Sequence, residues 1–183
     1  ASKFNIDPDF ILTLTIWIIP CALIGARAYY VLFNWERYAG DFSAIINVRA
    51  GGLAVHGGLI LCFIVGYMLC KYYKEKFLDV ADLVAPVIAL AQSIGRWGNF
   101  FNEEAHGYAT DLPWAQIING VGYHPTFLYE SIWCFLLFIF LMWFSNNKRA
   151  FSGQIICLYA ILYSVERFFV ESFRTDSLMV GPL

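Results

Sequence analysis

Apolar residues dominate five long stretches of the chain, and polar residues gather in the links between them. The apolar stretches cover residues 10–33, 52–73, 80–101, 127–144 and 153–173. A helix needs about 20 mostly apolar residues to cross the roughly 30 Å hydrocarbon core of a bilayer, so each stretch is close to the required length. The pattern predicts one all-α domain over residues 1–183, a multi-pass transmembrane bundle of five helices. The link over residues 102–126 is the longest and is rich in Asn, Glu, Asp, Gly and Pro.

The composition excludes several other classes of protein. Of the 183 residues, 60% are hydrophobic and 14% are charged, whereas a soluble domain is about half apolar and about a quarter charged. Too few charged side chains remain to solvate a surface, and the mean hydropathy of +0.60 agrees. An aromatic share of 19% excludes disorder. A net charge of -2 gives no field for binding nucleic acid.

Basic residues are distributed unevenly among the links. Lys71, Lys74 and Lys76 lie in or next to the second link and Lys148 and Arg149 in the fourth, whereas the third link has neither Lys nor Arg. Cytoplasmic links of membrane proteins carry an excess of Lys and Arg, so the second and fourth links and the N-terminal tail are predicted to be cytoplasmic. The first link, the third link and the C-terminal end then face outward.

Several ionisable side chains lie within the apolar stretches or at their ends. They are Arg27, Arg96, Arg167 and Arg174, with Glu130, Glu166 and Glu171. Such groups are costly at membrane depth and normally face a partner or a water-filled cavity. In the predicted orientation they gather near the outer leaflet, where His56 and Asn99 also lie. The sequence therefore predicts an outward-facing polar site.

The last apolar stretch carries a polar stripe. Tyr163, Arg167, Glu171 and Arg174 follow a 4, 4, 3 spacing, which at about 100° per residue puts them within roughly 80° of one another on a helix. One interpretation is an Arg–Glu pair that neutralises itself inside a bundle. The other is an excess of positive charge, because a guanidinium donates two parallel hydrogen bonds to a phosphate. Together with Arg96, the stripe favours a binding site for an anionic lipid.

A second polar segment covers residues 95–104 and reads Gly-Arg-Trp-Gly-Asn-Phe-Phe-Asn-Glu-Glu. Glycines on both sides of Arg96 let backbone N–H groups approach an anion closely. Asn99 and Asn102 offer further donors and acceptors. The plainer alternative is a helix end that frays in an aromatic belt at the membrane interface.

Histidine and cysteine offer fewer candidates. Histidine is the usual general base in proteins, so His56 is the candidate for that role, although a lone histidine at an interface is more often only a hydrogen-bonded polar residue. The two glycines after it leave room for a bulky ligand or for a neighbouring helix. His124-Pro125 predicts a turn or a helix start. The five cysteines form neither a CxxC motif nor a cluster with His, which indicates buried small side chains and no metal site.

In this order, the motifs resemble the phosphatidylglycerol–prolipoprotein diacylglyceryl transferase family of bacterial lipoprotein maturation. The matching residues are Gly25-Ala26-Arg27, His56-Gly57-Gly58, the 95–104 segment with Ala105-His106-Gly107, His124-Pro125, Tyr129-Glu130-Ser131, Tyr163, Arg167, Glu171 and Arg174. They extend along the whole chain. The pattern Gly-Arg-x-Gly-Asn-Phe-x-Asn-x-Glu within them is long and specific.

The resemblance implies a seven-helix enzyme of the bacterial cytoplasmic (inner) membrane, monomeric, with its active site toward the outer leaflet. It implies transfer of the diacylglyceryl group from phosphatidylglycerol to the lipobox cysteine thiol in the signal peptide of a preprolipoprotein. The products would be a thioether and glycerol phosphate. No metal or cofactor is implied.

The resemblance also implies residue roles. Arg96 and Arg167 would stabilise the departing phosphate, and His56 would activate the thiol. The implied substrate-binding residues are Arg27, Gly98, Asn99, Asn102, Glu104, Tyr129, Glu130, Tyr163, Glu171 and Arg174. Of these, Tyr129 and Glu130 would shape the outer mouth of the site.

The chain departs from the family in length. The family has a helix before Phe10 and another after Arg174, and both are expected to be absent here. Because the chain begins with Ala1 rather than Met, we expect a piece of a longer protein. The alternatives are a non-catalytic protein that binds anionic lipid and a transporter. A transporter would spread its polar residues through the membrane depth.

Overall fold

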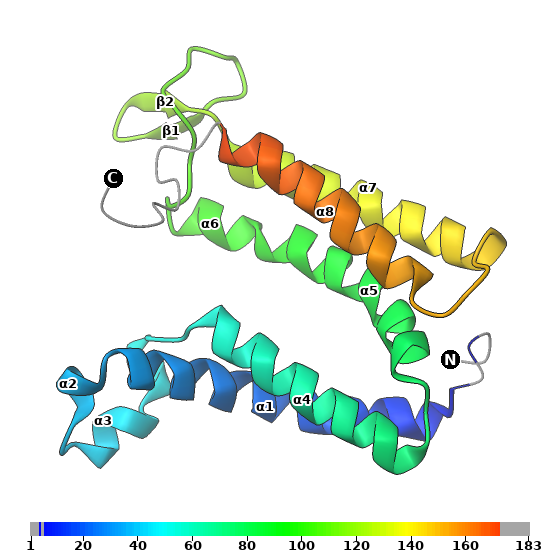
Figure 1. Cartoon of the computed structure of the whole chain (residues 1–183). Coiled ribbons are helices and arrows are strands. Elements are labelled where there is room, and N and C mark those ends of the chain that lie inside the picture. The colour runs from blue at the N-terminus through cyan, green and yellow to red at the C-terminus, as the bar shows by residue number, and fades with distance from the viewer. Residues whose placement is uncertain (1–3, 5, 173–183) are drawn as a thin grey trace. The chain divides into compact units, whose positions relative to one another are not determined.

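The computed structural model describes residue 4 and residues 6–172, and the chain divides into two compact units, Ala1–Val80 and Ala81–Leu183. Helices make up most of the described residues (Figure 1). The predicted all-helical, multi-pass class is confirmed. The prediction that residues 1–183 form a single bundle stays a prediction.

Each predicted span corresponds to a helix. The helices are α1 (Pro8–Phe33), α4 (Val55–Tyr73), α5 (Phe77–Gly95) continued by α6 (Trp97–Phe101), α7 (Thr126–Asn147) and α8 (Gln154–Glu171). Within the described residues, four segments are long and apolar enough to cross a membrane: α1, α4, the α5–α6 segment and α7. Helix α8 is not among them and carries three charged residues, Glu166, Arg167 and Glu171.

In the first unit, α1 and α4 pack side by side through glycine (Figure 1). A Cβ built on Gly25 would lie 2.5 Å from the carbonyl oxygen of Gly57, and one on Gly58 would lie 2.9 Å from that of Ala22. Small residues let two helix backbones approach this closely. The room beside His56 is therefore filled by a neighbouring helix.

The link between α1 and α4 is held by Arg27. Short helices α2 (Trp35–Tyr38) and α3 (Phe42–Ile46) and a 3-10 turn (Val48–Ala50) form this link. Arg27 is 6% exposed, and its guanidinium donates to four main-chain carbonyl oxygens. They belong to Ala44 (2.6 Å), Ile45 (2.8 Å), Gly51 (2.7 Å) and Gly52 (2.9 Å). These bonds satisfy the buried charge with carbonyl dipoles.

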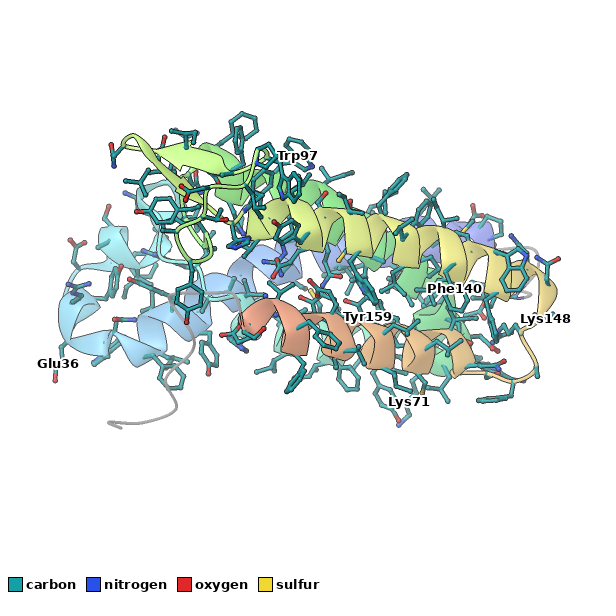
Figure 2. All side chains as sticks on the ribbon, turned by 90° about the horizontal axis from the view of Figure 1, so that it is seen from above. Glu36, Lys71, Trp97, Phe140, Lys148 and Tyr159 are labelled. Carbon is teal, nitrogen blue, oxygen red and sulfur yellow. The ribbon has the colours of Figure 1, made fainter. Side chains whose placement is uncertain are left out.

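In the second unit, α5, α7 and α8 share one apolar core. Its buried members are Ala85, Ala89, Leu137, Leu141 and Ile155. The two alanines are four residues apart, so they lie on one face of α5 and let α7 and α8 approach it. Figure 2 labels Trp97 near the hairpin end of this unit and Lys148 at the opposite end.

A buried aspartate anchors the start of α8. Asp82, on α5, is 0% exposed and accepts hydrogen bonds from the backbone N–H groups of Gly153, Ile155 and Ile156, each at 2.9 Å. Its second oxygen also accepts from Nε of Arg149 at 2.9 Å. A carboxylate at a helix N-terminus satisfies N–H groups that lack an intrahelical partner and matches the helix dipole. Our sequence analysis missed this residue.

The 102–126 link contains a β-hairpin that the hydropathy pattern did not predict. Strands β1 (Gln116–Ile118) and β2 (Val121–Tyr123) are antiparallel, with Ile117 opposite Gly122. Asn119 and Gly120 between them have φ values of 50° and 81°. Positive φ at both central residues is typical of the tight turn that Asn-Gly favours. This dipeptide was the signal available in the sequence.

Candidate functional site

Three helical segments of the second unit bring charged side chains to one point. Arg96 lies at the junction of α5 and α6, Glu130 in the first turns of α7, and Arg167 near the end of α8. Glu130 is 2% exposed, and its two carboxylate oxygens pair with Nε of Arg96 and Nη1 of Arg167. Tyr163 and Glu171 extend this group, which we name the Glu130 cluster.

The cluster alternates positive and negative groups. Nη2 of Arg167 donates to Glu171 at 2.8 Å, and Nη2 of Arg96 donates to the hydroxyl of Tyr163 at 3.3 Å. The arginine side chains are 21% and 24% exposed, whereas that of Glu130 is 3% exposed. Each guanidinium is thus fixed on its inner side and accessible on the other. A planar guanidinium held in this way can donate further hydrogen bonds to a phosphate.

Polar contacts between the helices fix the position of the cluster. Ser93 on α5 and Ser131 on α7 each donate a side-chain hydrogen bond of 2.8 Å to the other's carbonyl oxygen. Nε1 of Trp97 donates to the hydroxyl of Ser131 at 3.1 Å. The hydroxyl of Tyr159 on α8 donates to Gln92 on α5 at 2.9 Å. These contacts hold the segments that carry Arg96, Glu130 and Arg167.

The 95–104 segment continues from the cluster into an exposed loop. A Cβ on Gly98 would meet no atom of the described structure within 4 Å, so this backbone is open to a ligand. Asn99 is half-buried, and its carbonyl accepts from the N–H of Glu104 at 3.1 Å. Nδ2 of Asn102 donates to Oε1 of Glu104 at 3.0 Å. The amide of Asn102 and the carboxylate of Glu104 thus pair with each other.

Tyr129 directly precedes Glu130 in sequence and contacts the 102–126 link. Its hydroxyl accepts from Nε1 of Trp114 at 3.1 Å and contacts Nδ1 of His124 at 3.3 Å. Pro125 is the N-cap residue of α7, which agrees with the predicted helix start. Thr126 donates to the carbonyl of Ala105 and ties the link to α7.

The remaining predicted residues lie elsewhere in the chain. His56 is exposed in the first turn of α4 in the first unit, with its ring 6.4 Å from that of Tyr29. Arg27, also in the first unit, holds the link after α1, and its direct contact with substrate stays a prediction. Arg174 lies outside the described residues.

The described cysteines are neither paired in disulfides nor grouped with other residues around a metal site. All five cysteines are free, and Cys70 and Cys134 are buried, whereas Cys157 is exposed. Burial was thus the correct expectation for two of them and the wrong one for Cys157. Among the described residues, no group of three His, Cys, Asp or Glu side chains is arranged to hold a metal ion.

Fold and cluster together define an all-helical, multi-pass membrane protein with a buried carboxylate between two arginines. The family model described as prolipoprotein diacylglyceryl transferase matches residues 1–183. The chain belongs to this family, as its motifs predicted.

Curated relatives agree with this assignment. A phosphatidylglycerol–prolipoprotein diacylglyceryl transferase of Finegoldia magna is 51% identical over all of this chain and 74% of its own length. A Clostridioides difficile protein of the same name is 54% identical over all of this chain and 73% of its own. One from Thermosynechococcus vestitus is 45% identical, with coverage of 100% and 72%.

Proposed function

We propose that this chain transfers the diacylglyceryl group of phosphatidylglycerol to the lipobox cysteine thiol of a preprolipoprotein and releases glycerol phosphate. Membership of the family supports the reaction and both substrates. One observation supports the assignment to residues: guanidinium groups from two different helical segments meet at a single anionic group. A phosphate offers the same kind of acceptor to the same donors.

The proposed reaction is a displacement at carbon. The thiol sulfur attacks the glyceryl carbon that carries the phosphate, the carbon–oxygen bond breaks, and the electron pair stays on the phosphate oxygen. Arg96 and Arg167 neutralise the charge that develops there, which counts for most in a site with little water. His56 accepts the thiol proton. The nucleophile belongs to the substrate, so the chain's own cysteines take no part.

Other residues of the site support these two arginines. Glu130, Glu171 and Tyr163 orient the guanidiniums through the contacts described above. Gly98, Asn99, Asn102 and Glu104 complete the substrate site beside the arginines, with Tyr129 at the outer mouth and Arg174 adding positive charge. Arg27 acts through the link that it holds.

The proposed setting is the bacterial cytoplasmic (inner) membrane, with the chain as a monomer. The lysine-rich links lie on the cytoplasmic side by the positive-inside rule. The 102–126 link and the Glu130 cluster then lie at the outer leaflet. A thiol that follows an exported signal peptide would meet the lipid there.

Mass spectrometry of a lipobox peptide tests this function. The peptide is incubated with the chain and phosphatidylglycerol in detergent, and we expect a mass gain of one diacylglyceryl group that disappears when the thiol is blocked. Arg96→Ala and Arg167→Ala should abolish the gain, whereas the control Lys74→Ala should keep it. Full activity in either arginine variant would contradict the assigned roles. No adduct with the unaltered chain would contradict the function.

A further inference from the structure

A pocket of about 400 Å³ lies between α7 and α8. Its lining residues are His124, Tyr129, Trp133, Glu166, Phe169 and Val170. Tyr129 and Trp133 are four residues apart on α7, and the last three share one face of α8. Tyr129 directly precedes Glu130, and Glu166 directly precedes Arg167. The pocket is therefore lined by the immediate chain neighbours of Glu130 and Arg167.

Glu166 is the unusual member of this lining. It is 4% exposed, and neither of its carboxylate oxygens has a hydrogen-bond donor among the described residues. Glu130, one helix away, is equally buried but pairs with two arginines. Burying an ionised carboxylate without a hydrogen-bond partner is costly, so burial favours the protonated form of Glu166. A protonated carboxyl offers one O–H donor and further acceptor capacity to a ligand.

The pocket combines hydrogen-bonding groups with aromatic walls. The carboxyl of Glu166 can bond a hydroxyl group, while Trp133 and Phe169 cover apolar C–H surface. Small-molecule sites are mostly apolar with a few polar groups that fix orientation, and this volume is within their usual range of about 300–1,000 Å³. An uncharged polyhydroxyl group fits this chemistry better than a cationic one, since the protonated form of Glu166 carries no charge.

We propose that this pocket binds the glycerol headgroup of phosphatidylglycerol, with the protonated carboxyl of Glu166 hydrogen-bonded to a headgroup hydroxyl. The inference rests on the proposed function, which puts the phosphate on Arg96 and Arg167. One ester arm of that phosphate carries the diacylglyceryl group and the other enters the pocket. Glu166 is then a specificity residue for the headgroup.

Product inhibition separates the headgroup from the phosphate. Glycerol phosphate and inorganic phosphate both compete for the arginines, but only glycerol phosphate carries the headgroup. In the peptide transfer assay, we expect glycerol phosphate to inhibit at a concentration about tenfold lower than phosphate. Glu166→Leu should reduce this ratio to near one, because one neutral hydrogen bond is worth up to about tenfold in affinity. Glu166→Gln keeps an uncharged donor and acceptor and should keep the ratio.

Controls make each outcome decisive. Phe168→Leu changes a residue of α8 that is 77% exposed and outside the pocket lining, and should leave the ratio unchanged. Equal ratios in Glu166→Leu and the unaltered chain, with transfer intact, would overturn the headgroup site but not the proposed function. If Glu166→Gln lowers the inhibition ratio as much as Glu166→Leu does, the role of Glu166 as an uncharged hydrogen-bonding group is overturned. Absence of transfer in the unaltered chain would overturn both. If the Leu variant fails to fold, Trp133→Leu tests the pocket from α7 with the same expected loss.

Discussion

Replacing Glu130 with Gln removes the anion between two arginines and changes almost nothing in shape. Each hydrogen bond between charged groups contributes about 1.5–3 kcal/mol, and Glu130 accepts from both Arg96 and Arg167. The Gln carbonyl oxygen keeps a weaker form of one bond, and the arginines are partly solvated. We therefore expect the free energy of unfolding to fall by about 3 kcal/mol, which is at the low end of the cost of breaking a buried ion pair.

A loss of about 3 kcal/mol shifts the unfolding equilibrium by roughly 150-fold and lowers Tm by about 6–12 °C for a chain of this size. The six tryptophans allow a melt to be followed by intrinsic fluorescence in detergent. Glu36→Gln, on an exposed surface of α2, is the matched control and should leave Tm unchanged. If the Tm of Glu130→Gln lies within about 1–2 °C of the Tm of the unaltered chain, the view that this carboxylate holds the helices together is refuted.

Two further predictions use the same melt. Asp82→Ala removes the acceptor of three backbone N–H groups and of Arg149. We expect the free energy of unfolding to fall by about 3 kcal/mol. A thermal unfolding curve like that of Lys74→Ala would contradict the anchoring role of Asp82. In Gly57→Ala, the added methyl group would overlap atoms of Gly25 and Tyr29 on α1. We expect the free energy of unfolding to fall by about 1–3 kcal/mol. Its control is Gly66→Ala, whose Cβ would lie 3.8 Å from Ile18 and should be tolerated; equal effects of the two alanines would contradict the close contact of α1 with α4.

The helices were predictable because burial in a membrane demands long apolar runs. The ends of α1 and α7 agree with the pattern to within three residues. The hairpin was missed because hydropathy does not register a three-residue strand, although Asn119-Gly120 marked its turn. Asp82 was missed because its partners are backbone N–H groups 71 to 74 residues away in sequence.

The members of the Glu130 cluster could be named from the sequence, but their arrangement could not. Arg96 and Arg167 stood out because a charge within an apolar run requires a partner. That Glu130 is the shared partner depends on how α7 lies against α5 and α8, which no local spacing encodes. A pair between Arg167 and Glu171 was one of two interpretations of their spacing, and the structure has it at 2.8 Å. Glu166 could be noticed in the sequence as a flanking charge, but its unpaired state needed the structure.

The charges on α8 have a consequence for biosynthesis. Charged side chains raise the free energy of inserting a helix into a bilayer, and α8 carries Arg167 together with two glutamates. Its partners on α5 and α7, Asp82 and Glu130, leave the ribosome earlier because they precede it in the chain. If α8 is the fifth span that the hydropathy pattern predicts, it enters the bilayer by docking onto helices already present. A substitution at Glu130 would then act during synthesis, by stranding α8 outside the membrane, before it could act on any substrate.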